Sequence, residues 1–338
     1  MTGQDGGGAP GAGFLAVDSG GSGLRAVVGV PGREPSAPLV SREPVRTGAR
    51  GLDPGHLLEG LLPMARALAD SYGLERMTTA VVGAAGLAGL GDALRAELPD
   101  ALARELGVRT VALAADAVTA YVGALGPRPG AVVAAGTGVI AIGSDLTGWR
   151  RADGWGHLLG DCGSGAWIGR AGLDAALRAL DGRDGGSAAL RAAAEERFGP
   201  LRGLPGQLYP RADRPAVLAS FAPHVADRAG AGDPVAAAIL RAAARHLAES
   251  AAAVCPTSGA PRVALTGGLF KLGDPLLVPL AEELARLLPQ ARRVPAEGDP
   301  LHGAVRVASD LVTGVLTLPG DENLLTIVHI KLVHTNGD

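Results

Sequence analysis

Three apolar stretches of this chain each run into a glycine-rich turn, and this recurrence limits the folds that the chain can adopt. The stretches are GFLAVDSGGSGLRAVVGV at 13–30, GAVVAAGTGVIAIGSD at 130–145 and RVALTGGLF at 262–270. Short apolar runs bounded by glycine are typical of buried β-strands. The stretches at 13–30 and 130–145 therefore predict β-hairpins, and their similar patterns suggest two copies of one hairpin.

Helical patterns alternate with these strands, which indicates an α/β fold. The helix at 53–73 has the clearest ends, because Asp53 is a good N-cap, Pro54 suits the first turn and Gly73 suits the C-terminus. Further strands are expected near 37–45, 77–86 and 109–116. The predicted helices cover 53–73, 92–106, 117–125, 164–180, 187–197, 215–229, 234–253, 274–288 and 300–315.

The length of 338 residues predicts two lobes, since a domain typically holds about 150 residues, and two lobes create a cleft. We expect a disordered N-terminus at 1–12, an N-terminal lobe at 13–128, a C-terminal lobe with helical insertions at 129–300 and a closing helix at 301–318.

The tail at 319–338 differs in composition from the rest of the chain. Residues 1–320 contain no asparagine and a single lysine, Lys271, whereas the tail contains Asn323, Asn336 and Lys331. We interpret it as a segment of different origin and leave it out of the functional reasoning. Comparing the intact mass with that of the natural gene product tests this hypothesis.

Charge and apolar runs favour a small-molecule partner. The formal net charge is −3 and the arginines are dispersed, which argues against nucleic acid or an anionic membrane as the main partner. No apolar run reaches the roughly 18 residues that span a bilayer. Cys162 and Cys255 are the only cysteines, too few for a disulfide scaffold. We expect a cytoplasmic protein.

The glycine turns suit phosphate binding, because a residue without Cβ lets backbone N–H groups approach phosphate oxygens. Asp18 ends the first strand two residues before its glycines, where it could organise a hydrated Mg²⁺. Asp116 ends another strand and begins a helix, a position that suits either an N-cap or a catalytic base. The chain has neither a G-K-[ST] loop nor a G-x-G-x-x-G turn opening a helix after the first strand.

These motifs resemble those of the sugar kinase, actin and Hsp70 superfamily, in the order DSGGSGLR, AAGTGVIAIG and VALTGGLF. The segment GWGHLLGDCGSGAWIGR, at 154–170, is similar to that of N-acetylglucosamine kinases within the BadF/BadG/BcrA/BcrD ATPase family. The resemblance runs from about 14 to 315. It implies a two-lobed, actin-like (ribonuclease H-like) fold that binds ATP and Mg²⁺ in a central cleft, with an amino sugar above, and a homodimer.

The resemblance also implies roles for single residues. Asp116 corresponds to the catalytic base, which also contacts the sugar, and Asp18 to the metal-binding carboxylate. Gly154 and Asp161 match positions that hold sugar hydroxyls. The nucleotide-binding positions are Gly20, Gly21, Ser22, Gly136, Thr137, Gly138, Gly267 and Gly268. The implied activity is transfer of phosphate from ATP to an amino sugar, N-acetylglucosamine first, at its 6-hydroxyl.

The chain departs from the family pattern in its sugar half. Cys162 replaces the usual glutamate, Val139 replaces a serine, and VRTGARGLDPG lacks the asparagine that contacts the sugar. Two other interpretations stay open. One is an ATPase that activates a 2-hydroxyacyl-CoA dehydratase or benzoyl-CoA reductase, in which a dimer shares an iron-sulfur cluster through two cysteines per chain. The other is a nucleotide-binding regulator without catalysis.

Overall fold

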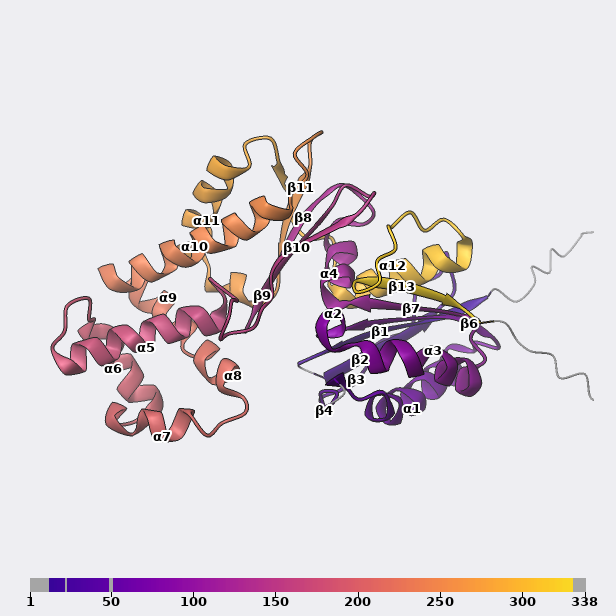
Figure 1. Cartoon of the computed structure of the whole chain (residues 1–338), viewed down its shortest axis with the longest axis horizontal. Coiled ribbons are helices and arrows are strands. Elements are labelled where there is room, and N and C mark those ends of the chain that lie inside the picture. The colour runs from indigo at the N-terminus through magenta and orange to yellow at the C-terminus, as the bar shows by residue number, and fades with distance from the viewer. Residues whose placement is uncertain (1–11, 22, 49–50, 331–338) are drawn as a thin grey trace, which may run out of the picture. The chain divides into compact units, whose positions relative to one another are not determined.

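The computed structural model describes residues 12–21, 23–48 and 51–330, which form two compact α/β units (Figure 1). The first unit contains the described residues up to Arg128, a short return at Leu146–Trp149, and everything from Ala296 onward. The second contains Pro129–Asp145 and Arg150–Pro295. The expected boundary at residue 300 differs slightly, because the chain rejoins the first unit before the closing helix begins.

The first unit is built on a six-stranded sheet in the order β13-β7-β6-β1-β2-β3. Strands β1, β6 and β7 are parallel, whereas β2 and β13 run antiparallel to their neighbours. The middle strands are buried along nearly their whole length, because helices cover both faces. The strands are β1 (Gly13–Gly20), β2 (Gly23–Gly29), β3 (Leu39–Ser41), β6 (Met77–Ala84), β7 (Thr110–Ala115) and β13 (Leu325–His329), beside the small pair β4 (Thr47–Gly48) and β5 (Gly51–Leu52).

Helices α1 and α3 lie on one face of this sheet, and α4 and α12 lie on the other (Figure 1). Helix α1 begins as predicted: the Asp53 carboxylate accepts hydrogen bonds from the N–H groups of Gly55 and His56, and Gly73 ends the helix at φ +69°. The helices are α1 (Pro54–Tyr72), α2 (Leu87–Leu90), α3 (Asp92–Leu106), α4 (Asp116–Leu125) and α12 (Pro300–Thr313).

Helices α4 and α12 cross at glycines. A Cβ atom on Gly303 would overlap the carbonyl oxygen of Thr119, and one on Gly123 would overlap that of Asp299. Both glycines are therefore required by the close approach of the two backbones. This contact holds α12 against the helix that Asp116 begins.

The second unit has a five-stranded sheet in the order β10-β9-β8-β11-β12. Strands β8 and β9 form the second predicted hairpin, and β11 lies parallel to β8. The strands are β8 (Gly130–Ala135), β9 (Val139–Ser144), β10 (Trp149–Asp153), β11 (Arg262–Thr266) and β12 (Arg292–Arg293). The helices are α5 (Gly165–Asp181), α6 (Ala188–Phe198), η1 (Leu201–Gly203), α7 (Leu204–Leu208), α8 (Arg214–Ala219), α9 (Ala222–Gly230), α10 (Pro234–Val254), η2 (Gly268–Leu272) and α11 (Asp274–Leu287).

The structure corrects several expectations. The helix predicted at 215–229 is two helices, α8 and α9, with a break at Ser220 and Phe221. Strand β10 was not predicted, because the sequence WRRAD has no apolar alternation. The tail that was set apart contributes β13, which pairs with β7 and buries Leu324 and Leu325. Its proposed separate origin stays a hypothesis.

Candidate active site

Two acidic residues of the first unit lie at one end of its sheet. Asp18 of β1 is in register with Gly83 of β6, and Gly83 is in register with Ala114 of β7. Because the three strands are parallel and adjacent, Asp18 and Asp116 lie at the same end of the sheet. Their backbones are about 10 Å apart, with one strand between them. The structure thus brings together the predicted base and the predicted metal-binding carboxylate.

The carboxyl group of Asp116 is buried enough to perturb its ionisation. Burial, followed by the negative charge of Asp18, raises the pKa of Asp116 from its ordinary value of 3.8 to about 6, against the lowering effect of the backbone N–H of Ala117. That N–H donates to Asp116 Oδ1 at 2.9 Å. Asp116 is the first residue of α4, and the N-cap position belongs to Ala115. A pKa near neutrality is typical of a general base.

The first glycine turn follows Asp18 directly. Gly20 and Gly21 have open space where a side chain would stand, so a ligand can approach their backbone. Ser22, the third residue predicted for this loop, lies outside the described residues. The Asp18 carboxylate itself is bound by Arg25 of β2, a residue that sequence reasoning passed over.

The second glycine turn, in the other unit, is fastened to the start of α5. The N–H groups of Gly165 and Ala166 donate to the carbonyl oxygens of Gly136 and Thr137 at 2.9 and 3.0 Å. A Cβ on Gly138 would lie 2.6 Å from Asp161 Oδ2. The predicted phosphate loop and the predicted sugar-binding aspartate are therefore in contact.

The third glycine turn packs against the end of β8. Gly267 has φ +106°, and a Cβ there would overlap the carbonyl oxygen of Ala135. Glycine is needed at this position for both reasons. Gly268 begins η2, and open space lies where its Cβ would stand. The second and third turns thus lie side by side at one end of this sheet.

The segment that follows β10 is folded around Asp153, which sequence reasoning missed. Its Oδ1 accepts a hydrogen bond from Asp161 N at 2.6 Å, and its Oδ2 accepts one from Cys162 N at 2.9 Å. Asp161 Oδ1 in turn accepts from Gly156 N at 3.2 Å. Asp153 and Asp161 both have positive φ, 60° and 54°. Such strain in two neighbouring non-glycine residues is a recurring feature of ligand-binding loops.

Burial also perturbs the ionisation of Asp161 in this segment. The pKa of Asp161 is raised by burial and by the charge of Asp153, while the N–H of Gly156 lowers it. Gly154 has φ +73° and lies over Ile140 of β9. Trp155 is 64% exposed and stacks under Arg151. Trp167 packs edge-on against His246.

Magnesium fits the carboxylates of the first unit by their chemistry. Mg²⁺ is usually held by one or two carboxylates together with substrate phosphates and water. Asp18 offers one such carboxylate, and its Oδ1 has no hydrogen-bond partner among the residues that the structure describes. Within those same residues, no group of three potential metal ligands is found.

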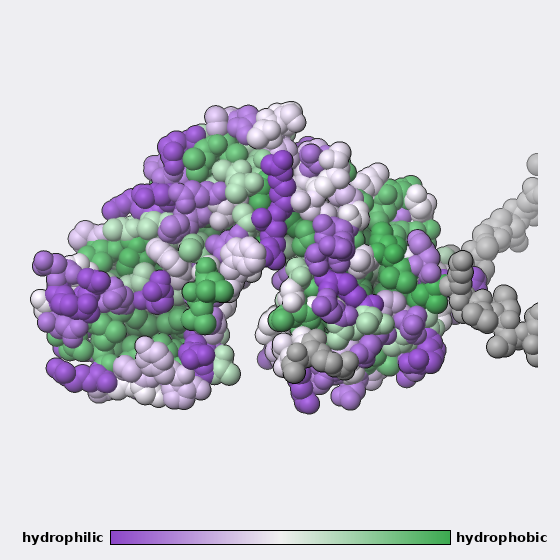
Figure 2. Space-filling view, viewed as in Figure 1, coloured by the Kyte–Doolittle hydropathy of each residue, from purple (hydrophilic) through white to green (hydrophobic). Residues whose placement is uncertain are grey.

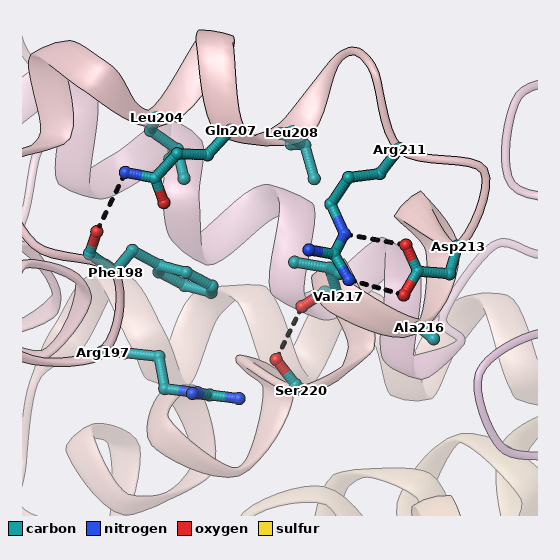
Figure 3. Close-up of a pocket in the computed structure, with 10 residues that line it drawn as sticks. All are labelled: Arg197, Phe198, Leu204, Gln207, Leu208, Arg211, Asp213, Ala216, Val217 and Ser220. Carbon is teal, nitrogen blue, oxygen red and sulfur yellow. Dashed lines mark hydrogen bonds and ion pairs between the residues drawn. The ribbon is translucent and has the colours of Figure 1, made fainter.

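A separate cavity of about 360 Å³ lies among the helices α6 to α8 of the second unit (Figure 3). Arg211 and Asp213, which both line it, pair through two hydrogen bonds of 2.7 Å, and Gln207 donates to the carbonyl oxygen of Phe198. None of the residues predicted for the site lines this cavity.

No described helix has both the length and the apolar character needed to cross a bilayer. The surface view shows polar and apolar residues mixed together (Figure 2).

Two α/β units that carry glycine turns after their strands, one with paired carboxylates at its sheet end, define an actin-like ATPase fold. The solved structures that resemble the chain agree. A protein of Chromobacterium violaceum assigned as an N-acetylglucosamine kinase is 29% identical, with a TM-score of 0.66 over 88% of this chain and 99% of that one. A counterpart from Porphyromonas gingivalis, 17% identical with a TM-score of 0.65 over the same shares, supports the fold alone.

Residues 17–304 match the BadF/BadG/BcrA/BcrD ATPase family, and the chain belongs to this family. The predicted α/β, actin-like fold class is confirmed. An N-acetylmuramic acid/N-acetylglucosamine kinase of Clostridium acetobutylicum is 44% identical over 69 residues. That match spans about a fifth of each protein, 20% of this chain and 22% of the relative.

Proposed function

We propose that this protein is an ATP-dependent kinase that phosphorylates an amino sugar, with N-acetylglucosamine as the first candidate and its 6-hydroxyl as the acceptor. The observation that carries the proposal is the pair Asp18 and Asp116 at one sheet end, with the pKa of Asp116 raised to about 6. Membership of an ATPase family supports the use of ATP. The 29% identical relative, matched along nearly its whole length, supports the sugar.

In this proposal Asp116 accepts the proton of the sugar hydroxyl as its oxygen attacks the γ-phosphorus of ATP, and the bond from phosphorus to the bridging oxygen of ADP breaks. Asp18 would hold Mg²⁺, and the bound ion would supply positive charge to the phosphates. In the first unit, the backbone of Gly20 and Gly21 would bind phosphate oxygens. In the second unit, the backbone of the turn at 136–138 would do so. The turn at 267–268 would lie against the adenosine.

The sugar would be held by the segment after β10. Asp161 would accept hydrogen bonds from sugar hydroxyls, and Gly154 would let the backbone approach the ring. The bonds from Asp153 to the N–H groups of Asp161 and Cys162 would fix this loop in a shape ready for the sugar. Cys162 stands next to Asp161, so the usual glutamate charge is absent there.

The cysteines do not support the dehydratase-activator alternative. Cys255 is only 2% exposed, and burial raises the pKa of its thiol to about 11. A cluster shared between two chains needs thiolates that reach the protein surface, and a buried, protonated thiol is a poor iron ligand.

ADP release tests the proposal across N-acetylglucosamine, glucosamine, N-acetylmuramic acid and glucose. We expect N-acetylglucosamine to stimulate turnover most, and Asp116→Asn to lower kcat by about 10²- to 10⁴-fold, the usual effect of removing a general base. A surface change in the same unit, Glu105→Gln, should leave kcat unaltered. Absence of stimulation by any sugar would favour the regulator instead.

A further inference from the structure

Arg25 is paired with Asp18 across two strands. The two residues are directly opposite each other in the antiparallel register of β1 and β2. Arg25 Nε and Nη2 both donate to Asp18 Oδ2, at 3.0 and 2.7 Å. The Asp18 side chain is 15% exposed and that of Arg25 is 33% exposed. The pair is therefore shielded from water more than a typical surface ion pair.

Arg25 is held from its other side by the helix that returns to this unit. Its Nη1 donates to Asp299 Oδ2 at 2.6 Å. Asp299 is the N-cap of α12, where its Oδ1 accepts a hydrogen bond from His302 N at 2.9 Å. A guanidinium fixed by two carboxylates on different elements has little freedom to rotate, because each of its three nitrogens has a partner.

This arrangement uses one carboxylate oxygen of Asp18 and makes no contact with the other. Both contacts from Arg25 go to Oδ2, and Oδ1 has no partner among the residues that the structure describes. A carboxylate fixed in this way can offer one oxygen to a cation without reorienting.

We propose that Arg25, fixed by Asp299, is a positioning residue that presents Asp18 Oδ1 to the magnesium ion of the nucleotide. This inference rests on the proposed function, because it assumes that Asp18 faces a metal-bound nucleotide. Arg25 acts through Asp18 and does not itself contact the phosphates. Its removal should weaken magnesium binding more than nucleotide binding.

Thermal unfolding of the intact protein separates these effects. In the first titration, Mg²⁺ is added at saturating ADP. The Mg²⁺ midpoint is the Mg²⁺ concentration that produces half of the further increase in Tm. In the second titration, ADP is added without Mg²⁺. We expect Arg25→Met to raise the Mg²⁺ midpoint about 10- to 100-fold, as the loss of a residue that orients a metal ligand typically does. The shift produced by ADP alone should stay as in the wild type.

Two further variants grade the effect. Asp299→Asn keeps the helix cap, since an amide oxygen can still accept from His302 N, but it weakens the hold on Arg25 and should raise the Mg²⁺ midpoint about threefold. Arg25→Lys retains the charge but cannot bridge both carboxylates, so its Mg²⁺ midpoint should lie between those of the wild type and Arg25→Met. If the methionine variant fails to fold, a raised midpoint in Arg25→Lys still tests the inference. Arg66→Met, which removes the surface pair with Glu105, is the matched control.

A wild-type Mg²⁺ midpoint in Arg25→Met and Arg25→Lys would overturn the inference alone. Loss of the shift with ADP alone in these variants would also overturn it, because Arg25 would then be a direct phosphate ligand. If the wild type itself shows no magnesium-dependent shift with ADP, the proposed function fails together with the inference.

Discussion

The ionisation of Asp116 illustrates how a functional residue can cost stability. Its pKa is 3.8 in an ordinary environment and about 6 in the folded protein. The folded state therefore holds this proton more tightly than the unfolded state. The sign follows from proton linkage: the contribution of Asp116 to stability is most favourable below about pH 4, becomes less favourable as the pH rises from about 4 to about 6, and is constant above that.

Asp116→Asn should therefore stabilise the protein at pH 8 and not at pH 4. The expected gain in the free energy of unfolding at pH 8 is about 1–3 kcal/mol, since two pKa units correspond to about 3 kcal/mol at most. Urea unfolding of both proteins at the two pH values measures it. An equal difference at pH 8 and pH 4 would contradict the raised pKa.

Asp153 shapes the loop after β10 because its carboxylate accepts hydrogen bonds from two backbone N–H groups. Asp153→Asn would turn an NH₂ group toward one of the two N–H donors, of Asp161 or Cys162, and leave that donor unpaired. We expect the KM for the sugar to rise about tenfold, in line with the cost of an unsatisfied buried donor, while the KM for ATP changes less than about twofold.

Steady-state kinetics with each substrate varied in turn measure this separation. The control is Asp174→Asn, which breaks an exposed pair with Arg178 on α5 in the same unit. A sugar KM equal to that of the wild type would show that the loop does not depend on Asp153.

At the scale of elements, β13 is a strand in the tail that was set apart by its composition. It covers the edge of β7, where the N–H of Ala115 donates to the carbonyl oxygen of Leu324. Arg95 donates to the carbonyl oxygen of Asn323, and the Asp321 carboxylate accepts from the N–H groups of Asn323 and Leu324. The strand therefore supports β7 immediately before Asp116.

A chain that stops after Gly320 should lose this support, whereas one that stops after Ile330 should keep it. Losing the burial of Leu324 and Leu325 costs about 3 kcal/mol, which corresponds to a Tm lower by about 4 °C in a protein of this size. Calorimetry of the two truncated proteins makes the comparison. Equal Tm values would mean that β13 adds nothing to the sheet.

At the scale of the whole molecule, neither unit is a continuous piece of chain. The chain leaves the first unit after Arg128, returns for Leu146–Trp149 and re-enters at Ala296. Within the first unit, helix α4 contacts each place where the chain leaves or re-enters it. Tyr121 of α4 donates to the carbonyl oxygen of Arg128 and packs edge-on against Trp149. The carbonyl oxygen of Ala124 accepts a hydrogen bond from Glu297 N. The helix that begins with Asp116 thus also holds the ends of the chain segments that connect the two units.

The homodimer stays a prediction.

Much of the fold could be predicted from short-range patterns. The hairpins at both glycine turns, helix α1 with its cap at Asp53, and helices α3 and α10 follow from apolar periodicity and from capping residues a few positions apart. The residues at the strand ends, Asp18 and Asp116, could be proposed in the same way. Their residue types and positions carry enough information to suggest phosphate chemistry.

What those patterns could not supply are partners that are distant along the chain. The bond between Arg25 and Asp299 joins positions 274 residues apart, β13 pairs with a strand more than 200 residues before it, and Asp153 serves N–H groups across a loop whose backbone is strained. Propensities and caps act over a few residues, so they reveal where helices and strands begin and end. The register between strands and the packing of one element on another place the charged groups of the site together, because those contacts exist only once the chain is folded.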